Sequence, residues 1–157
     1  MARATVIYDS TVDDFTDKRL FQMLKGKKHI AIIATTTRGD VFGGYYSVAV
    51  TKQKISFWDP NVFIFTFVSR WRCTTPKKCD VKESKKARAF IEFFKDDSSG
   101  WFVSFSGGDG LLFLGNEKSR TFCLDLYQGF ENIENTTQTP TVMKYFICCR
   151  IVAIQLE

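Results

Sequence analysis

The sequence has one histidine, His29, and five cysteines, so nucleophile–base catalysis would have to use this single imidazole. A serine or cysteine nucleophile needs a base within hydrogen-bond reach and a third group that orients the base. His29 follows the basic run LKGKK and begins an apolar segment, where a polar residue at a strand end is the simpler interpretation. A Cys–His29 pair stays open as an alternative. None of the cysteines, however, lies in a sequence context typical of a catalytic thiol.

Two glycine pairs raise the question of phosphate binding: Gly43-Gly44 in DVFGGYYS and Gly107-Gly108 in FSGGDGLL. A phosphate-binding loop follows its glycines with Lys-Ser/Thr, so that backbone amides hold the phosphate and the lysine neutralises it. Neither stretch has that lysine, and neither matches the dinucleotide-binding fingerprint between strand and helix. We therefore expect a sheet bend at the first pair and a tight hairpin at the second. Asp109 in GGDG is a candidate magnesium ligand, although tight turns favour glycine and aspartate on their own account.

Metal-binding and acid–base patterns are also weak in this sequence. Cys73 and Cys79 are too widely spaced for a zinc knuckle, and only His29 could complete a site. The carboxylate pairs Asp13-Asp14 and Asp96-Asp97 lie in turn-like runs, which solvated loops explain. We therefore expect no enzyme activity, no metal and no cofactor.

The net charge of +5 is concentrated in one segment. Residues 70–95 contain nine basic and three acidic residues, a charge of +6, so the rest of the chain carries −1. A basic segment suits an acidic partner such as nucleic acid, anionic lipid or an acidic protein surface, whereas a solvated loop is the plain alternative. Tryptophan and arginine are also enriched at binding hot spots. The candidate partner-binding residues are Arg70, Trp71, Arg72, Lys77 and Lys78.

Length and cysteine usage set the expected context. A chain of 157 residues fits one domain, residues 1–157, and is long enough to fold without a disulfide or metal. No signal peptide or membrane span is evident, so we expect no membrane insertion, a cytoplasmic location and five reduced, mostly buried thiols. The loose basic cluster PKKCDVKESKKAR leaves nuclear entry open. A redox-active thiol is a further hypothesis, and Cys73 beside Arg72 is its best candidate.

Periodicity predicts a β-rich domain with roughly eight strands and a minority of helix. The segment DDFTDKRLFQML predicts one helix, capped by Ser10 or Thr11 and stopped by Gly26, with its apolar residues on one face. Residues 86–94 are compatible with either helix or strand, and the phenylalanines favour strand. We expect strands at 5–8, 29–37, 41–50, 62–69, 86–94, 100–105, 111–115 and 144–157, the last as one long strand in the middle of a sheet.

The order of these motifs resembles the TLDc domain, the module of the oxidation-resistance proteins. The likeness is carried by VIYDS before a helix ending in LKGK, then DVFGGYYSVAV, DPNVFIFTFVS, WFVSFSGGDGLLFLGNEKSRTFC and the closing FICCRIVAIQLE. Two stretches depart from the family pattern, because Asp109 interrupts the glycine run and the closing strand lacks the usual acidic-then-Trp ending.

The resemblance implies a β-sandwich of two antiparallel sheets with small flanking helices and no enzymatic activity. It also implies a role in the oxidative-stress response and in regulation of the V-type proton pump, whose subunits would then be protein partners. The main alternative, from the residues themselves, is a nucleic-acid-binding protein that uses the Arg70–Lys95 segment. The oligomeric state is not predicted. The residues that carry the family pattern are structural: Phe42, Gly43, Gly44, Phe63, Phe65, Gly107 and Gly108.

Overall fold

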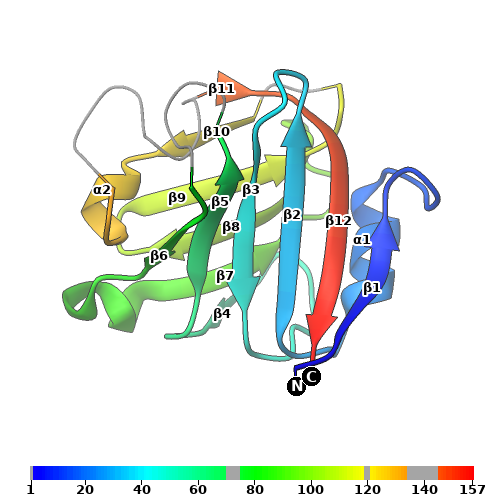
Figure 1. The fold of residues 1–157 in the computed structure, drawn as a ribbon. Coiled ribbons are helices and arrows are strands. Elements are labelled where there is room, and N and C mark those ends of the chain that lie inside the picture. Colours follow the sequence, from blue (N-terminus) through cyan, green and yellow to red (C-terminus); the bar gives the residue numbers. More distant parts are fainter. Residues whose placement is uncertain (1, 70–74, 119–120, 134–144) are drawn as a thin grey trace.

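The computed structural model describes residues 2–69, 75–118, 121–133 and 145–157, and these form two antiparallel six-stranded sheets packed face to face (Figure 1). This architecture confirms the expected β-sandwich with small helices. The first sheet has the order β1 (Ala4–Asp9), β12 (Cys148–Leu156), β2 (Ile30–Thr36), β3 (Val41–Tyr46), β5 (Phe63–Val68), β6 (Lys77–Asp80). The second has the order β11 (Tyr145–Phe146), β10 (Thr121–Leu124), β9 (Gly110–Gly115), β8 (Trp101–Gly107), β7 (Ala89–Phe93), β4 (Ser56–Trp58).

The core lies between the two sheets and is built by alternation along the strands. In β2, Ile30, Ile32 and Ala34 are buried, and Val103 and Phe105 of β8 are buried from the opposite sheet. Successive side chains of a strand point to opposite faces, so each of these strands also presents a second, outward set of residues.

Strand β7 confirms the strand that was predicted for the second half of residues 86–94. For the first half of that segment, the prediction of a strand is wrong. Ala89, Ile91 and Phe93 are buried on one face, as alternation predicts. The residues before them form a short 3-10 helix, η1 (Glu83–Arg88). The ladder with β8 begins at the Ala89–Gly107 pair and β8 turns back at Gly108, so residues before Ala89 have no β8 partner.

The first helix, α1 (Asp17–Leu24), starts later than predicted. Its cap is Thr16, whose hydroxyl oxygen accepts the amide of Arg19 at 3.1 Å. Ser10 and Thr11 lie too far before Asp17 to cap this helix, and their hydroxyls bind elsewhere: that of Ser10 accepts the Ile151 amide and that of Thr11 donates to Asp9. The predicted stop holds, since Gly26 follows the helix with φ of +75°.

The predicted long closing strand is two strands in different sheets. Strand β11 pairs with β10 in the second sheet, whereas β12 pairs with β1 and β2 in the first. The chain changes sheets around Ile147, whose carbonyl accepts the amide of Thr37 at 3.1 Å. This crossing joins the two sheets near the β2–β3 turn.

The described part of the chain holds twelve strands rather than about eight. The strands that periodicity missed are β4, β6 and β10, with three or four residues each, whereas β11 lies within the predicted closing segment. All of the missed strands lie at or next to a sheet edge and are too short to show an alternating pattern. Helices cover the flanks: α1 beside β1, and η1 and α2 (Leu126–Gly129) on the opposite side (Figure 1).

Candidate interaction surface

The first glycine pair allows two close approaches to strand β3. A Cβ on Gly43 would overlap the carbonyl oxygen of Ile32 and would come within 3.0 Å of the Phe65 ring. A Cβ on Gly44 would lie 2.6 Å from the ring of Phe105, which belongs to the opposite sheet. Phe42, just before the pair, is buried in the core. Both glycines lie within strand β3 and have close neighbours on either side, so this stretch forms no loop that could cradle a phosphate.

The second glycine pair forms the tight turn between β8 and β9. Gly108 has φ of +57°, and Gly107 pairs with Gly110 across the hairpin. Asp109, the candidate magnesium ligand, accepts a hydrogen bond from the Arg88 guanidinium at 3.0 Å. No group of three metal-ligating side chains occurs in the part of the chain that the structure describes.

A row of aromatic rings lies on the outer face of the first sheet. Tyr45 and Phe63 stack with centroids 4.7 Å apart and planes 18° apart. Phe65 continues the row along β5 with centroids 6.2 Å from Phe63, and Phe67 follows at 5.1 Å. Phe67 is 44% exposed. The strand predicted at 62–69 places these three phenylalanines on one face, because alternate residues of a strand point to the same side.

The aromatic row belongs to a wider apolar surface that crosses five strands. One register joins Phe63, Tyr45, Ala31, Ile154 and Val6 in cross-strand pairs. The next register joins Phe65, Gly43, Ile33 and Val152. Among the residues that the structure describes, no helix lies over this face (Figure 1). We call this surface the apolar band: Val6, Ala31, Ile33, Tyr45, Phe63, Phe65, Val152 and Ile154. Val6 is exposed, Ala31 and Phe65 are buried, and the other five are half-buried.

Lysine 78 of β6 lies at one end of the apolar band. Its ammonium is 4.4 Å from the centroid of the Phe63 ring, within cation–π range. The same ammonium pairs with Asp80 at 3.2 Å, and both side chains are more than half exposed. Lys77 instead donates to the backbone carbonyl of Asn132 at 3.0 Å. Of the two predicted partner-binding residues that the structure describes, Lys77 and Lys78, it is therefore Lys78 that meets the band.

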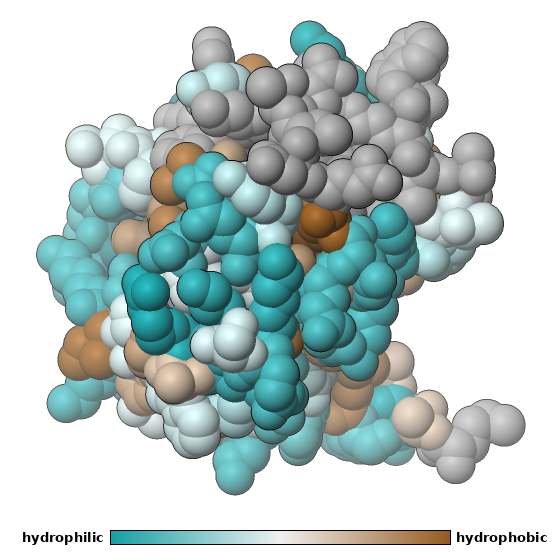
Figure 2. All heavy atoms as spheres, turned by 90° about the vertical axis from the view of Figure 1, so that its left-hand side faces the viewer, coloured by the Kyte–Doolittle hydropathy of each residue, from teal (hydrophilic) through white to brown (hydrophobic). Residues whose placement is uncertain are grey.

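The other members of the predicted patch, Arg70, Trp71 and Arg72, lie outside the described residues, as does Cys73. Much of the remaining basic segment is already paired: Lys86 binds Glu83 at 2.8 Å, and Arg88 binds Asp109. The flank formed by β6, η1 and α2 is mostly hydrophilic (Figure 2). The apolar band is the feature that sequence reasoning missed, and the outward alternation of phenylalanines in β5 was its available signal.

A shallow pocket of about 510 Å³ adjoins the aromatic row. Tyr45, Phe63 and Val62 are among its apolar lining residues. Its charged lining is mixed, since Lys78 and Lys86 lie there with Asp80, Glu83 and Glu131. This mixture gives the pocket no strong preference for an anion or a cation.

Neither His29 nor the cysteines form a catalytic pair in the described structure. His29 is exposed at the start of β2, and its Nδ1 is hydrogen-bonded to the Tyr45 hydroxyl at 2.9 Å. Of the four cysteines described, Cys79, Cys123 and Cys148 are buried thiols and Cys149 is exposed, as expected for mostly buried reduced cysteines. The Cys149 thiol donates to the carbonyl of Thr35 at 3.3 Å.

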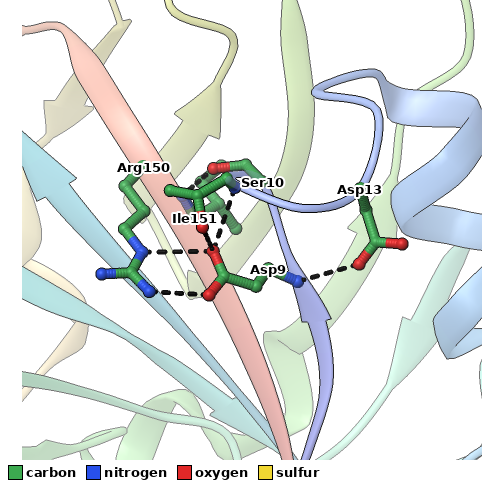
Figure 3. A network of polar contacts seen from close by, with 6 residues as sticks. Asp9, Ser10, Asp13, Arg150 and Ile151 are labelled. Carbon is green, nitrogen blue, oxygen red and sulfur yellow. Dashed lines mark hydrogen bonds and ion pairs between the residues drawn. The ribbon is translucent and has the colours of Figure 1, made fainter.

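The most connected charged group holds strand β1 to β12 (Figure 3). The Asp9 carboxylate accepts two hydrogen bonds from the Arg150 guanidinium, at 3.2 and 2.6 Å. It also accepts the amide and hydroxyl of Thr11. These hydrogen bonds, first those from Arg150 and then those from Thr11, hold the pKa of Asp9 well below its usual range. Ser10 completes the link by accepting the Ile151 amide at 2.9 Å, so the network is structural.

The fold and the motif order agree with a comparison of the chain with known families. The model of the TLDc domain matches residues 1–141. The chain therefore belongs to the TLDc domain family. No curated protein sequence matches it. In addition, no helix in the described ranges is long and apolar enough to cross a membrane.

Proposed function

We propose that this TLDc domain is a non-catalytic protein-interaction module that acts in the cytoplasm, in the oxidative-stress response or in regulation of the V-type proton pump. The observation that supports it is the apolar band on the outer face of the first sheet. The outer face of an antiparallel sheet that meets water usually carries polar residues. A contiguous apolar surface with aromatic residues is typical of a protein-binding site.

Nucleic-acid binding is the second candidate, and the geometry at Phe63 argues against it. A base stacks on an aromatic ring only if one face of the ring is open. Tyr45 stacks on the Phe63 ring, and the Lys78 ammonium lies over the ring as well. The ring is thus engaged by its own neighbours, which suits side-chain packing with a protein better than stacking with bases.

An affinity capture from lysate tests both candidates. Wild type is compared with Arg70→Glu/Arg72→Glu/Lys77→Glu/Lys78→Glu, with and without nuclease. The control is Lys18→Glu/Lys25→Glu/Lys27→Glu/Lys52→Glu, which makes the same charge change at exposed sites outside the patch. We expect identified pump subunits to remain after nuclease, to be lost from the first variant and to be retained by the control. Capture of nucleic acid that disappears with nuclease and with the first variant would instead support the second candidate.

A further inference from the structure

The apolar band has the dimensions of a single helix. It crosses five strands, which at about 4.8 Å per interval gives a length of roughly 19 Å. Its two registers lie about 7 Å apart along the strands, so with side chains the band is roughly 10 Å wide. An α-helix is about 10–12 Å across and rises about 1.5 Å per residue, so about 13 residues would cover the band.

The same dimensions disfavour a second copy of the chain as the occupant. A band of roughly 19 by 10 Å covers about 200 Å² in projection. A stable protein–protein interface needs about 800 Å² on each partner. A dimer through this face would therefore have to extend well beyond the apolar residues onto the charged margins. A single amphipathic helix needs no such extension.

Charge is distributed around the band rather than within it. The eight residues of the band carry no formal charge. At the β6 end, Lys78 is opposite Phe65 across the strand pair and is 58% exposed. Its partner Asp80 is also exposed, and exposed pairs of this kind contribute only about 0–1 kcal/mol. The Lys78 ammonium is therefore available to a carboxylate of a bound partner.

At the opposite margin, the charged residues of strands β1 and β12 are Asp9 and Arg150, and they pair with each other. Arg150 lies one register beyond the band, and Asp9 engages its guanidinium through two hydrogen bonds. The band is thus uncharged, and at its β6 end Lys78 can exchange Asp80 for another carboxylate. A complementary partner would have an apolar stripe and a carboxylate at the end that faces β6.

We infer that the apolar band binds one amphipathic helix of a partner protein, about 13 residues long, with its apolar stripe on the aromatic rings and a carboxylate facing Lys78. This inference rests on the proposed function as a protein-interaction module and names the surface and the partner chemistry. Binding of an amphipathic helix through apolar residues at i, i+3, i+4 and i+7 is a common recognition mode.

The test uses three synthetic 14-residue helical peptides and the full-length chain. One peptide has a leucine stripe flanked by glutamates, the second has lysines in place of the glutamates, and the third has the composition of the first with its leucines shuffled. Binding is measured by fluorescence anisotropy. Spin-labelled forms of the first and third peptides are used to find which amide resonances they broaden.

Three variants locate the site. Ile33→Thr/Val152→Thr/Ile154→Thr keeps β-branched residues in the strands but makes the band polar. Lys78→Glu reverses the charge at its end. Val12→Thr/Leu124→Thr, the matched control, changes exposed apolar residues outside the band.

We expect the glutamate peptide to bind and to broaden the resonances of Ile33, Val152 and Ile154. The triple variant should weaken its affinity at least tenfold and Lys78→Glu several-fold, whereas the control should leave it unchanged. Lys78→Glu should also strengthen binding of the lysine peptide. If the triple variant does not fold, the broadening in the wild-type chain still decides the location.

Several results would overturn the inference. These are equal binding of the shuffled peptide, broadening confined to residues outside the band, and an affinity that the triple variant leaves unchanged. A reversible dimer in sedimentation that the triple variant abolishes would assign the band to a second copy. Cosedimentation with phosphatidylcholine–phosphatidylserine vesicles that the triple variant abolishes would assign it to a lipid surface. Peptide binding at the band without capture of pump subunits would reject the proposed pump partner alone.

Discussion

The ring of Phe65 lies directly over the backbone of Gly43 on the outer face of the first sheet. The two residues are cross-strand partners, and a Cβ at position 43 would come within 3.0 Å of the Phe65 ring. The same Cβ would also overlap the carbonyl oxygen of Ile32 in the neighbouring strand. The glycine therefore sets how closely β2, β3 and the Phe65 ring pack, and the apolar band depends on that packing.

Gly43→Ala should destabilise the fold by roughly 1–3 kcal/mol, the usual cost of forcing an extra methyl group into a packed site. The backbone carbonyl of Ile32 cannot move aside as a flexible side chain could. Urea unfolding followed by tryptophan fluorescence measures the change. Gly39→Ala is a comparison variant: its Cβ would meet nothing within 4 Å, but its φ of +86° strains an alanine, so it reports backbone strain without crowding. A Gly43→Ala chain as stable as wild type would show that crowding at β3 does not affect stability.

Tyr46→Phe should leave the fold unchanged or stabilise it by about 1 kcal/mol. The Tyr46 hydroxyl is buried and has no hydrogen-bond partner among the residues that the structure describes, and burial raises its pKa well above the usual range. Removing a desolvated polar group that has no partner removes its desolvation penalty. Thermal unfolding measures the effect.

Tyr8→Phe should instead destabilise the fold, although Tyr8 is as buried as Tyr46. The Tyr8 hydroxyl donates to the carbonyl of Asp14 at 2.9 Å, and this bond anchors the loop before α1. Its loss should destabilise the fold by about 1 kcal/mol, a typical net contribution of a hydrogen bond. If both Tyr→Phe variants changed stability by the same amount and sign, the difference in hydrogen bonding between the two hydroxyls would not explain their energetics.

The Asp9–Arg150 contact should make stability depend on acidic pH. The pKa of Asp9 is lowered in the folded chain, so its contribution is fully present above the unfolded value of about 4 and is lost as pH falls below it. Asp9→Asn should therefore reduce stability at pH 7 and flatten the loss of stability between pH 4 and pH 2. Urea midpoints at pH 7, 4 and 2.5 measure this. Glu83→Gln, at an exposed carboxylate, is the control, and an Asp9→Asn profile parallel to wild type would contradict the expectation.

Much of the fold could be predicted, because alternation of apolar and polar residues along a segment indicates which face of the strand is buried. Strand β7 is of this kind, because its buried residues Ala89, Ile91 and Phe93 follow period-2 alternation, whereas β2, β5 and β8 each bury consecutive residues. The short edge strands β4 and β6 could not be predicted, since three or four residues show no period and their pairing depends on distant partners. The helix start was misplaced because Arg150, which is 141 residues from Asp9 in sequence, helps to fix Asp9 in the turn that uses the Thr11 amide.

The candidate surface was predicted only in part, because a sequence shows which residues share a strand face but not which face is covered. The alternation of Phe63, Phe65 and Phe67 is clear in the sequence, yet it is equally compatible with a buried side. Their outward position follows from the register with β3, where Gly44 faces the core and Gly43 faces out. The charge cluster in the sequence includes Lys78, which lies beside the band, whereas ion pairs of Lys86 and Arg88 reduce the free charge of that segment.

Thiol reactivity should separate Cys149 from the three buried cysteines. Cys79, Cys123 and Cys148 are buried. The Cys149 thiol is exposed and donates a hydrogen bond to the carbonyl of Thr35, near the end of β2. Reaction with a disulfide reagent in native buffer, in a Cys73→Ser background, should modify one thiol quickly and three only after unfolding. Adding Cys149→Ser should abolish the fast phase. Two or more fast thiols in the Cys73→Ser chain would mean that a buried cysteine becomes accessible by local opening. Hydrogen exchange of β12 and its neighbouring strands would then test where the opening occurs.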